Sequence, residues 1–98
     1  MSECSFRIET AFFIEKLRRW ALCGRAYADV RVGDALSASA HSSQAWRVEE
    51  IETYGRKTDL LSRMMTDTLI VSATGEGDAP QENLMLYTVI VHANPPSP

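Results

Sequence analysis

The stretch VRVGDAL, residues 30–36, carries the most structural information in this sequence. Its apolar residues alternate with polar or small ones, and a Gly-Asp pair interrupts the alternation. Period-two alternation is typical of a strand with one buried face, and Gly and Asp are common turn residues. We therefore predict a strand, a tight turn at Gly33 and a second strand, with Val30 and Val32 packed inward. The Asp34 carboxylate is expected to accept hydrogen bonds from backbone amides of the turn.

Most of the remaining chain also has the pattern of strands. Period-two alternation or short β-branched runs occupy 6–14, 20–27, 46–51, 66–73 and 84–92. In the first of these, five residues would share one face: Phe6, Ile8, Thr10, Phe12 and Ile14. The apolar alternation of 46–51 changes parity at Glu49-Glu50, which indicates a β-bulge or a bend. Together these segments predict an all-β fold, a small six-stranded antiparallel barrel.

The segment 12–24 is open to two interpretations. Four of its residues fall at helical spacing: Phe13, Leu17, Trp20 and Ala21. However, Thr10 is the only N-capping side chain that comes just before Phe12. We prefer strands at 6–14 and 20–27 joined by the charged loop EKLRR, and a short helix is the alternative.

Length and composition limit the class of protein. Ninety-eight residues suit one domain, and we expect it to span 1–92, followed by a disordered Pro-rich tail at 93–98. The net charge of −3 argues against a strongly basic nucleic-acid-binding protein. The first residues, MSECSFRIE, have neither a basic stretch nor an apolar core, so we expect no signal peptide. No apolar run approaches the roughly 20 residues of a membrane-spanning helix. A cytoplasmic protein that does not contact a membrane, with Cys4 and Cys23 reduced, is expected.

The sequence offers little for catalysis or metal binding. The two histidines, His41 and His92, have no further ligands at suitable spacing, so we predict no metal site and no cofactor. Cys23 is interpreted as a small packing residue. Glu49 and Glu50 would need a bulge to serve one substrate as general acid and base, and solvated carboxylates are the simpler interpretation. We predict no catalytic residue and expect that the protein is not an enzyme.

Several short motifs occur in a characteristic order: IETAF at 8–12, GRA at 24–26, VGD at 32–34 and GRK at 55–57. Their order and spacing resemble the second domain of translational GTPases such as elongation factor Tu, a translation-protein β-barrel. The resemblance covers roughly residues 5–92. No phosphate-binding loop of the G-x-x-x-x-G-K-[ST] kind occurs, so the resemblance implies a stand-alone barrel without a GTPase domain.

The resemblance also implies binding residues. In that family the second domain contacts the aminoacyl end of tRNA and the small ribosomal subunit. Glu9, Phe12 and Arg56 match positions that help to shape the aminoacyl pocket, although for Phe12 we prefer the interpretation as plain core. The predicted binding residues also include two basic groups: Lys16, Arg18 and Arg19 in the first, Arg56 and Lys57 in the second.

Three functional hypotheses follow. The first is a non-enzymatic barrel that acts as a protein-interaction or accessory module. Its partner would be an unknown protein or a second copy of the chain in a homodimer. The alternative is an RNA- or ribosome-associated translation accessory factor. The third is small-molecule binding or an enzymatic role, which requires a concave pocket with convergent polar groups. An exposed apolar patch favours a protein partner, whereas basic residues gathered on one face favour RNA.

Overall fold

In a computed structural model of the chain, residues 4–38, 44–75, 77 and 79–89 are described. The predicted tail at 93–98, the last residues of the predicted strand 84–92, and both histidines lie outside these residues. The described residues form no helix that is long and apolar enough to cross a membrane.

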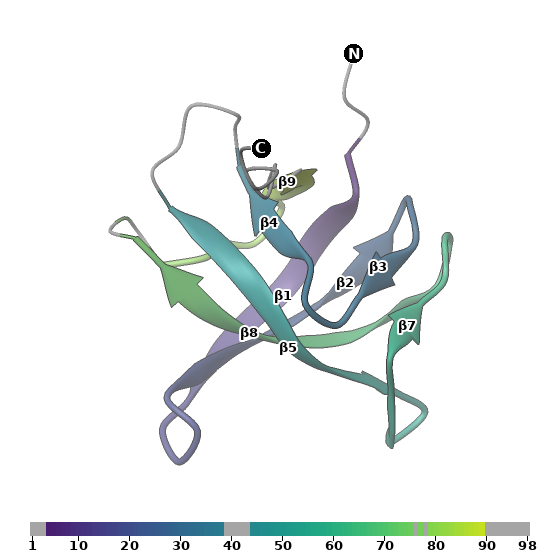
Figure 1. Cartoon of the computed structure of the whole chain (residues 1–98), viewed down its shortest axis with the longest axis horizontal. Coiled ribbons are helices and arrows are strands. Elements are labelled where there is room, and N and C mark those ends of the chain that lie inside the picture. The colour runs from purple at the N-terminus through teal and green to yellow at the C-terminus, as the bar shows by residue number, and fades with distance from the viewer. Residues whose placement is uncertain (1–3, 39–43, 76, 78, 90–98) are drawn as a thin grey trace, which may run out of the picture.

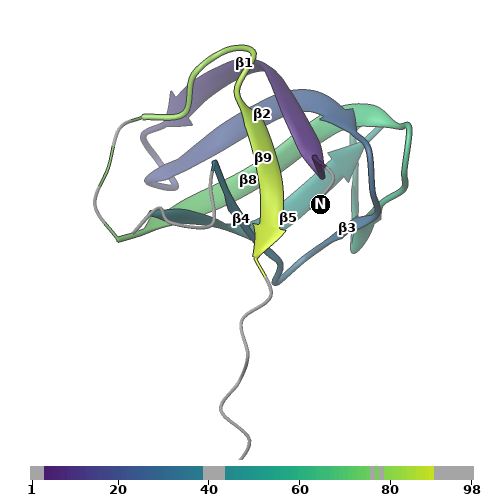
Figure 2. The same cartoon turned by 90° about the horizontal axis from the view of Figure 1, so that it is seen from above.

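The described chain is built from strands alone. They are β1 (Phe6–Ile14), β2 (Arg19–Ala26), β3 (Val30–Arg31), β4 (Ala35–Ser37), β5 (Ala45–Thr53), β6 (Arg56–Thr58), β7 (Leu60–Leu61), β8 (Thr66–Thr74) and β9 (Met85–Val89). Six of them pair antiparallel in the order β4-β9-β1-β2-β8-β5, and a further β4–β5 pairing closes the ring (Figures 1 and 2). The predicted all-β fold with a six-stranded antiparallel ring, nearly a barrel, is therefore confirmed. Outside the ring, β6 pairs with β5, while β3 and β7 form a separate two-stranded sheet.

The segment 12–24 is strand, loop and strand, so the helical alternative is wrong. β1 and β2 pair from Phe6 opposite Ala26 to Ile14 opposite Arg19, and a turn joins them. β2 also pairs with β8 on its other side. The sheet therefore satisfies backbone groups on both edges of β2, which outweighs the weak helical spacing of a few side chains.

A β-bulge in β1 changes which residues face the core. The β1–β2 register shifts between Ile8 and Thr10, so one extra residue enters the strand. Phe6 and Ile8 are buried, and beyond the bulge Ala11 is the residue that packs against the core. The prediction of one continuous apolar face is therefore wrong after Ile8. Phe12 is half exposed, and the interpretation of Phe12 as core is also wrong.

The bulge predicted in β5 is confirmed. The β5–β8 register shifts between Val48 and Glu50, and both Val48 and Ile51 are fully buried. The extra residue restores inward orientation to Ile51, which simple alternation would have turned to solvent.

The stretch 30–36 forms a corner that ties β3 and β4 to β5. Gly33 has φ +97°, and its N–H donates to the Val48 carbonyl at 2.8 Å. The Arg31 N–H donates to the Asp34 carboxylate at 2.9 Å, as predicted for the turn. Val30 is buried, but the prediction for Val32 is wrong: the turn follows β3 directly, the alternation stops, and Val32 is exposed.

Replacing Gly33 by alanine is expected to destabilise the fold by about 1–3 kcal/mol, the usual cost of a disfavoured backbone conformation. A Cβ at this position would meet nothing within 4 Å, so the cost is backbone strain alone. Urea unfolding checks this prediction, with Val32→Ala as the control for a neighbouring exposed position. Equal stabilities of Gly33→Ala and the wild type would contradict it.

The interior of the ring is filled by apolar side chains from both halves of the chain. The buried cluster consists of Phe6, Ile8, Leu22, Ala26, Val30, Leu36, Trp46, Val48, Ile51, Leu61, Leu69, Val71 and Leu86. Trp46 belongs to this core, and Trp20 packs partly buried against it. Most of the surface of both tryptophans is therefore buried.

Candidate functional site

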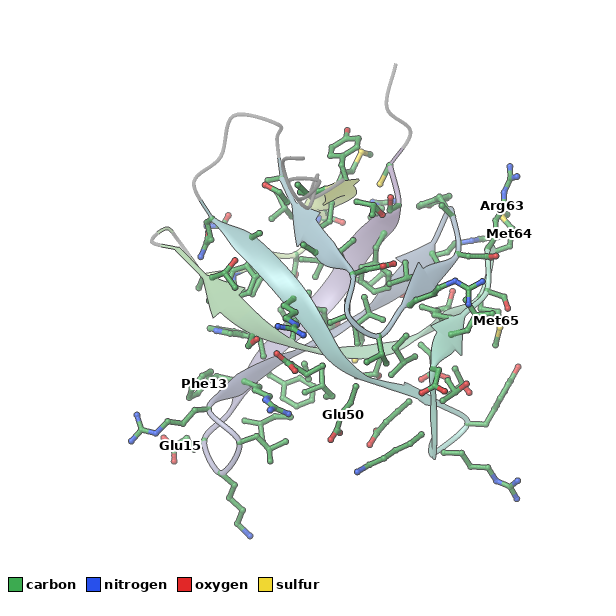
Figure 3. The ribbon with its side chains drawn as sticks, viewed as in Figure 1. Phe13, Glu15, Glu50, Arg63, Met64 and Met65 are labelled. Atoms are coloured by element: carbon green, nitrogen blue, oxygen red, sulfur yellow. The ribbon has the colours of Figure 1, made fainter. Side chains whose placement is uncertain are left out.

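The end of the β1–β2 hairpin, residues 12–20, exposes large apolar side chains. Phe12, Phe13 and Leu17 are 50%, 45% and 47% exposed. The Phe13 ring meets Trp20 edge to face, with ring centres 5.5 Å apart. Figure 3 shows Phe13 and Glu15 at this end of the molecule, on the opposite side from Arg63 and Met64. We call residues 12–20 the hairpin end.

An apolar layer lies beside Phe12 on the outer face of the sheet. Phe12 is opposite Ala21, and Ala21 is opposite Ile70 of β8. Residues opposite one another in a sheet share a face, so these three side chains form one row. Ala21 and Ile70 are buried although neither belongs to the interior cluster. The row ends at Glu50 of β5, which is opposite Ile70.

The turn of the hairpin end is positively charged. Residues 15–19 read EKLRR and hold three cations and one carboxylate, whereas the whole chain has a net charge of −3. Within the described residues, the ion pairs join Arg47 to Glu49 and Lys57 to Glu50. The exposed apolar side chains are therefore flanked by unpaired cations: Lys16, Arg18 and Arg19.

The second predicted basic group lies elsewhere. Arg56 and Lys57 are on β6, and three strands separate β6 from β1 in the sheet order. In Figures 1 and 2 the hairpin end and the turn after β5 occupy separate corners of the molecule. Glu9 is exposed in the β1 bulge. The structure thus brings Phe12 together with the first basic group, but it does not bring Glu9, Phe12 and Arg56 into one pocket.

Sequence reasoning did not select Phe13 and Leu17 as candidate surface residues. The adjacent aromatic pair was the available signal, because neighbouring strand residues point to opposite faces. One of Phe12 and Phe13 must therefore face outward, whatever the register.

The described residues line several hollows away from the hairpin end. The first, of about 410 Å³, is lined by Val32, Glu49, Glu50, Ile51, Lys57, Thr58 and Asp59. Its two glutamates are engaged: Glu49 accepts from the Ser72 hydroxyl at 2.7 Å, and Glu50 lies 3.6 Å from Lys57. The second, of about 340 Å³, is lined by Ala38, Gln44, Trp46, Gly77, Ala79, Pro80, Gln81 and Leu84. No group of three or more His, Cys, Asp or Glu side chains among the described residues could hold a metal ion.

The chain matches no protein-family model and no curated protein. The hairpin end combines aromatic, aliphatic and cationic side chains, a composition typical of the centre and rim of protein–protein interfaces.

Proposed function

We propose that this protein is a non-enzymatic interaction module that binds a protein partner through the hairpin end. The observation that carries the proposal is the exposure of Phe12, Phe13 and Leu17 at one hairpin end, where Phe12 continues the buried row of Ala21 and Ile70. Aromatic anchors on a well-packed support often dominate the affinity of protein interfaces. The surrounding cations would form the polar rim and favour a partner with acidic residues there.

An RNA- or ribosome-associated role is the second candidate. It is favoured by Lys16, Arg18 and Arg19 and by the resemblance of the VGD corner and the six-stranded ring to domain II of translation factors. A phosphate backbone is bound mainly by many cations along one surface. Because the two basic groups lie at separate corners and the net charge is −3, we rank a protein partner first.

The experiment is capture from lysate with three forms of the protein: wild type, Phe12→Ser/Leu17→Ser, and a control, Met85→Ser. Met85 lies on β9 and has a similar exposure to Phe12. We expect the double variant to capture at least about tenfold less of the partner protein, because truncating an interface anchor costs about 2 kcal/mol or more. The control should capture as much as the wild type, and ribonuclease and high salt should leave the complex intact.

Other outcomes contradict the proposal. Release of the captured material by ribonuclease, with loss of binding in Lys16→Glu/Arg18→Glu, would establish the RNA candidate instead. Undiminished capture by Phe12→Ser/Leu17→Ser would show that the partner binds another surface. Unfolding of each variant is measured in parallel, since exposed substitutions are expected to change stability by less than about 1 kcal/mol.

A further inference from the structure

The second half of β1 has an open edge. β1 pairs with β2 along its whole length, but it pairs with β9 only at Phe6 and Arg7. Ile8 then donates to the Leu84 carbonyl and accepts from the Asn83 N–H. Beyond Ile8, no strand in the described part of the chain lies along that side of residues 10–14. In Figure 1 the β1–β2 hairpin projects from the lower left of the ring.

Alternate residues of a strand turn their backbone groups toward the same neighbour. Ile8 turns its N–H and C=O toward the β9 side. The bulge inserts one residue after Ile8, so the same orientation is expected to recur at Ala11 and Phe13. Within the part of the chain that the structure describes, these two residues therefore present unpaired donors and acceptors, at an edge that carries Phe12 on one face and Phe13 on the other.

We infer that this edge accepts an extended segment of the partner protein as an added antiparallel strand. The inference rests on the proposed function and names its mode of binding. An exposed, apolar strand edge is a template for strand addition, in which backbone hydrogen bonds supply affinity and side chains supply specificity. It also explains why the apolar residues of β1 continue past the point where β9 ends.

The chemistry of the edge defines the segment. On one face it would contact Thr10, Phe12 and Ile14, and on the other Ala11 and Phe13, so β-branched residues suit it on both faces. A partner strand that is added antiparallel to β1 begins beside Ile14, so its first residues lie next to the basic turn. The partner segment therefore has acidic residues followed by a short β-branched run.

A second copy of this chain suits the edge less well. Two copies of β1 paired antiparallel about Phe12, the centre of residues 10–14, would place Glu9 of each copy opposite Glu15 of the other. Like charges directly opposite destabilise a strand pair, and the two-fold symmetry would impose this repulsion twice. A segment with acidic residues only at its first positions avoids it.

The test uses the acetylated, amidated peptide DEVTVTV with the full chain, followed by amide hydrogen exchange in NMR spectra. We expect the peptide to slow exchange at Ala11 and Phe13 by at least about tenfold, as expected for amides that gain a strand partner. A version N-methylated at alternate residues should not bind. The peptide KKVTVTV should bind more weakly, because its lysines would face the basic turn.

A pair of variants separates backbone pairing from side-chain contact. Ala11→Pro removes one edge N–H and leaves Phe12 and Phe13 in place, whereas Ala11→Ser keeps that N–H. We expect Ala11→Pro to weaken peptide binding about tenfold, the effect of one lost hydrogen bond of 1–1.5 kcal/mol, and Ala11→Ser to bind within about twofold of wild type. The N-methylated peptide tests the same hydrogen bonds in the wild-type protein, whatever the stability of Ala11→Pro.

Each contrary result has its own meaning. Absence of protection at millimolar peptide, or equal binding of the N-methylated peptide, overturns strand addition. Equal binding of KKVTVTV overturns the assignment of acidic residues. Shifts of the Phe12 and Phe13 rings without amide protection overturn strand addition and leave the hairpin end as an interaction surface. The proposed function fails separately, if Phe12→Ser/Leu17→Ser captures partners like the wild type.

Discussion

Gly24→Ala is expected to destabilise the protein by about 3 kcal/mol or more, the upper range for overpacking in a closely packed interior. Gly24 is buried on β2 opposite Ile8, directly beside the β1 bulge. A Cβ at this position would overlap the backbone carbonyl of Arg7 and touch the Phe6 ring. Since the overlap is with backbone rather than with a flexible side chain, β1 and β2 would have to separate locally.

The free energy of unfolding in urea measures this effect, and Gly33→Ala is the matched comparison. Both substitutions add one methyl group to a glycine, but only Gly24 meets backbone atoms, whereas Gly33 has open space around it. Gly24→Ala should therefore cost clearly more than Gly33→Ala. Combining Gly24→Ala with Phe6→Leu should not restore stability, because the carbonyl of Arg7 remains in place. A cost below about 1 kcal/mol would contradict the close approach of the two strands.

Phe6→Ala is expected to cost about 3–5 kcal/mol, the range for removing a buried aromatic side chain. Phe6 is fully buried at the start of β1 and belongs to the interior cluster. Phe12→Ala on the same strand should cost less than about 1 kcal/mol, because half of that side chain is already exposed to water. Chemical unfolding of the two variants gives both values under one set of conditions.

This pair tests the bulge as well as the core. A regular strand would place residues 6 and 12 on the same face, so equal costs would mean that Phe12 is also interior. Unequal costs agree with the register shift between Ile8 and Thr10. The same result would show that the hairpin end can be altered without unfolding the protein, which the binding experiments require.

The two bulges show how far sequence reasoning reached. The bulge in β5 could be predicted, because Val48 and Ile51 are separated by two glutamates and only a parity change buries both. The bulge in β1 could not, because Thr10, Phe12 and Ile14 form a plausible apolar face without it. Where the residues of both faces are apolar, alternation does not distinguish one register from the other.

The candidate site was predicted in part. Phe12 and the basic group Lys16, Arg18 and Arg19 were selected from the sequence, and the structure places them on one hairpin. Arg56 and Lys57 were selected because they are also basic residues, but they lie on β6, and three strands separate β6 from β1. Residue type can indicate binding chemistry, but it carries no information on which strands become neighbours.

The sequence by itself determined the class of fold, most of the strands of the ring and the corner at Gly33-Asp34. These features depend on short-range alternation and on turn residues, whose effects are confined to a few neighbouring positions. Only the tertiary structure decided the outward direction of Phe12, the separation of the two basic groups and the open edge of β1. Each of these depends on pairing between distant segments: β9 pairs with β1 at Phe6 and Arg7, Ile8 bonds to Asn83 and Leu84, and among the described residues no strand lies along that side of 10–14.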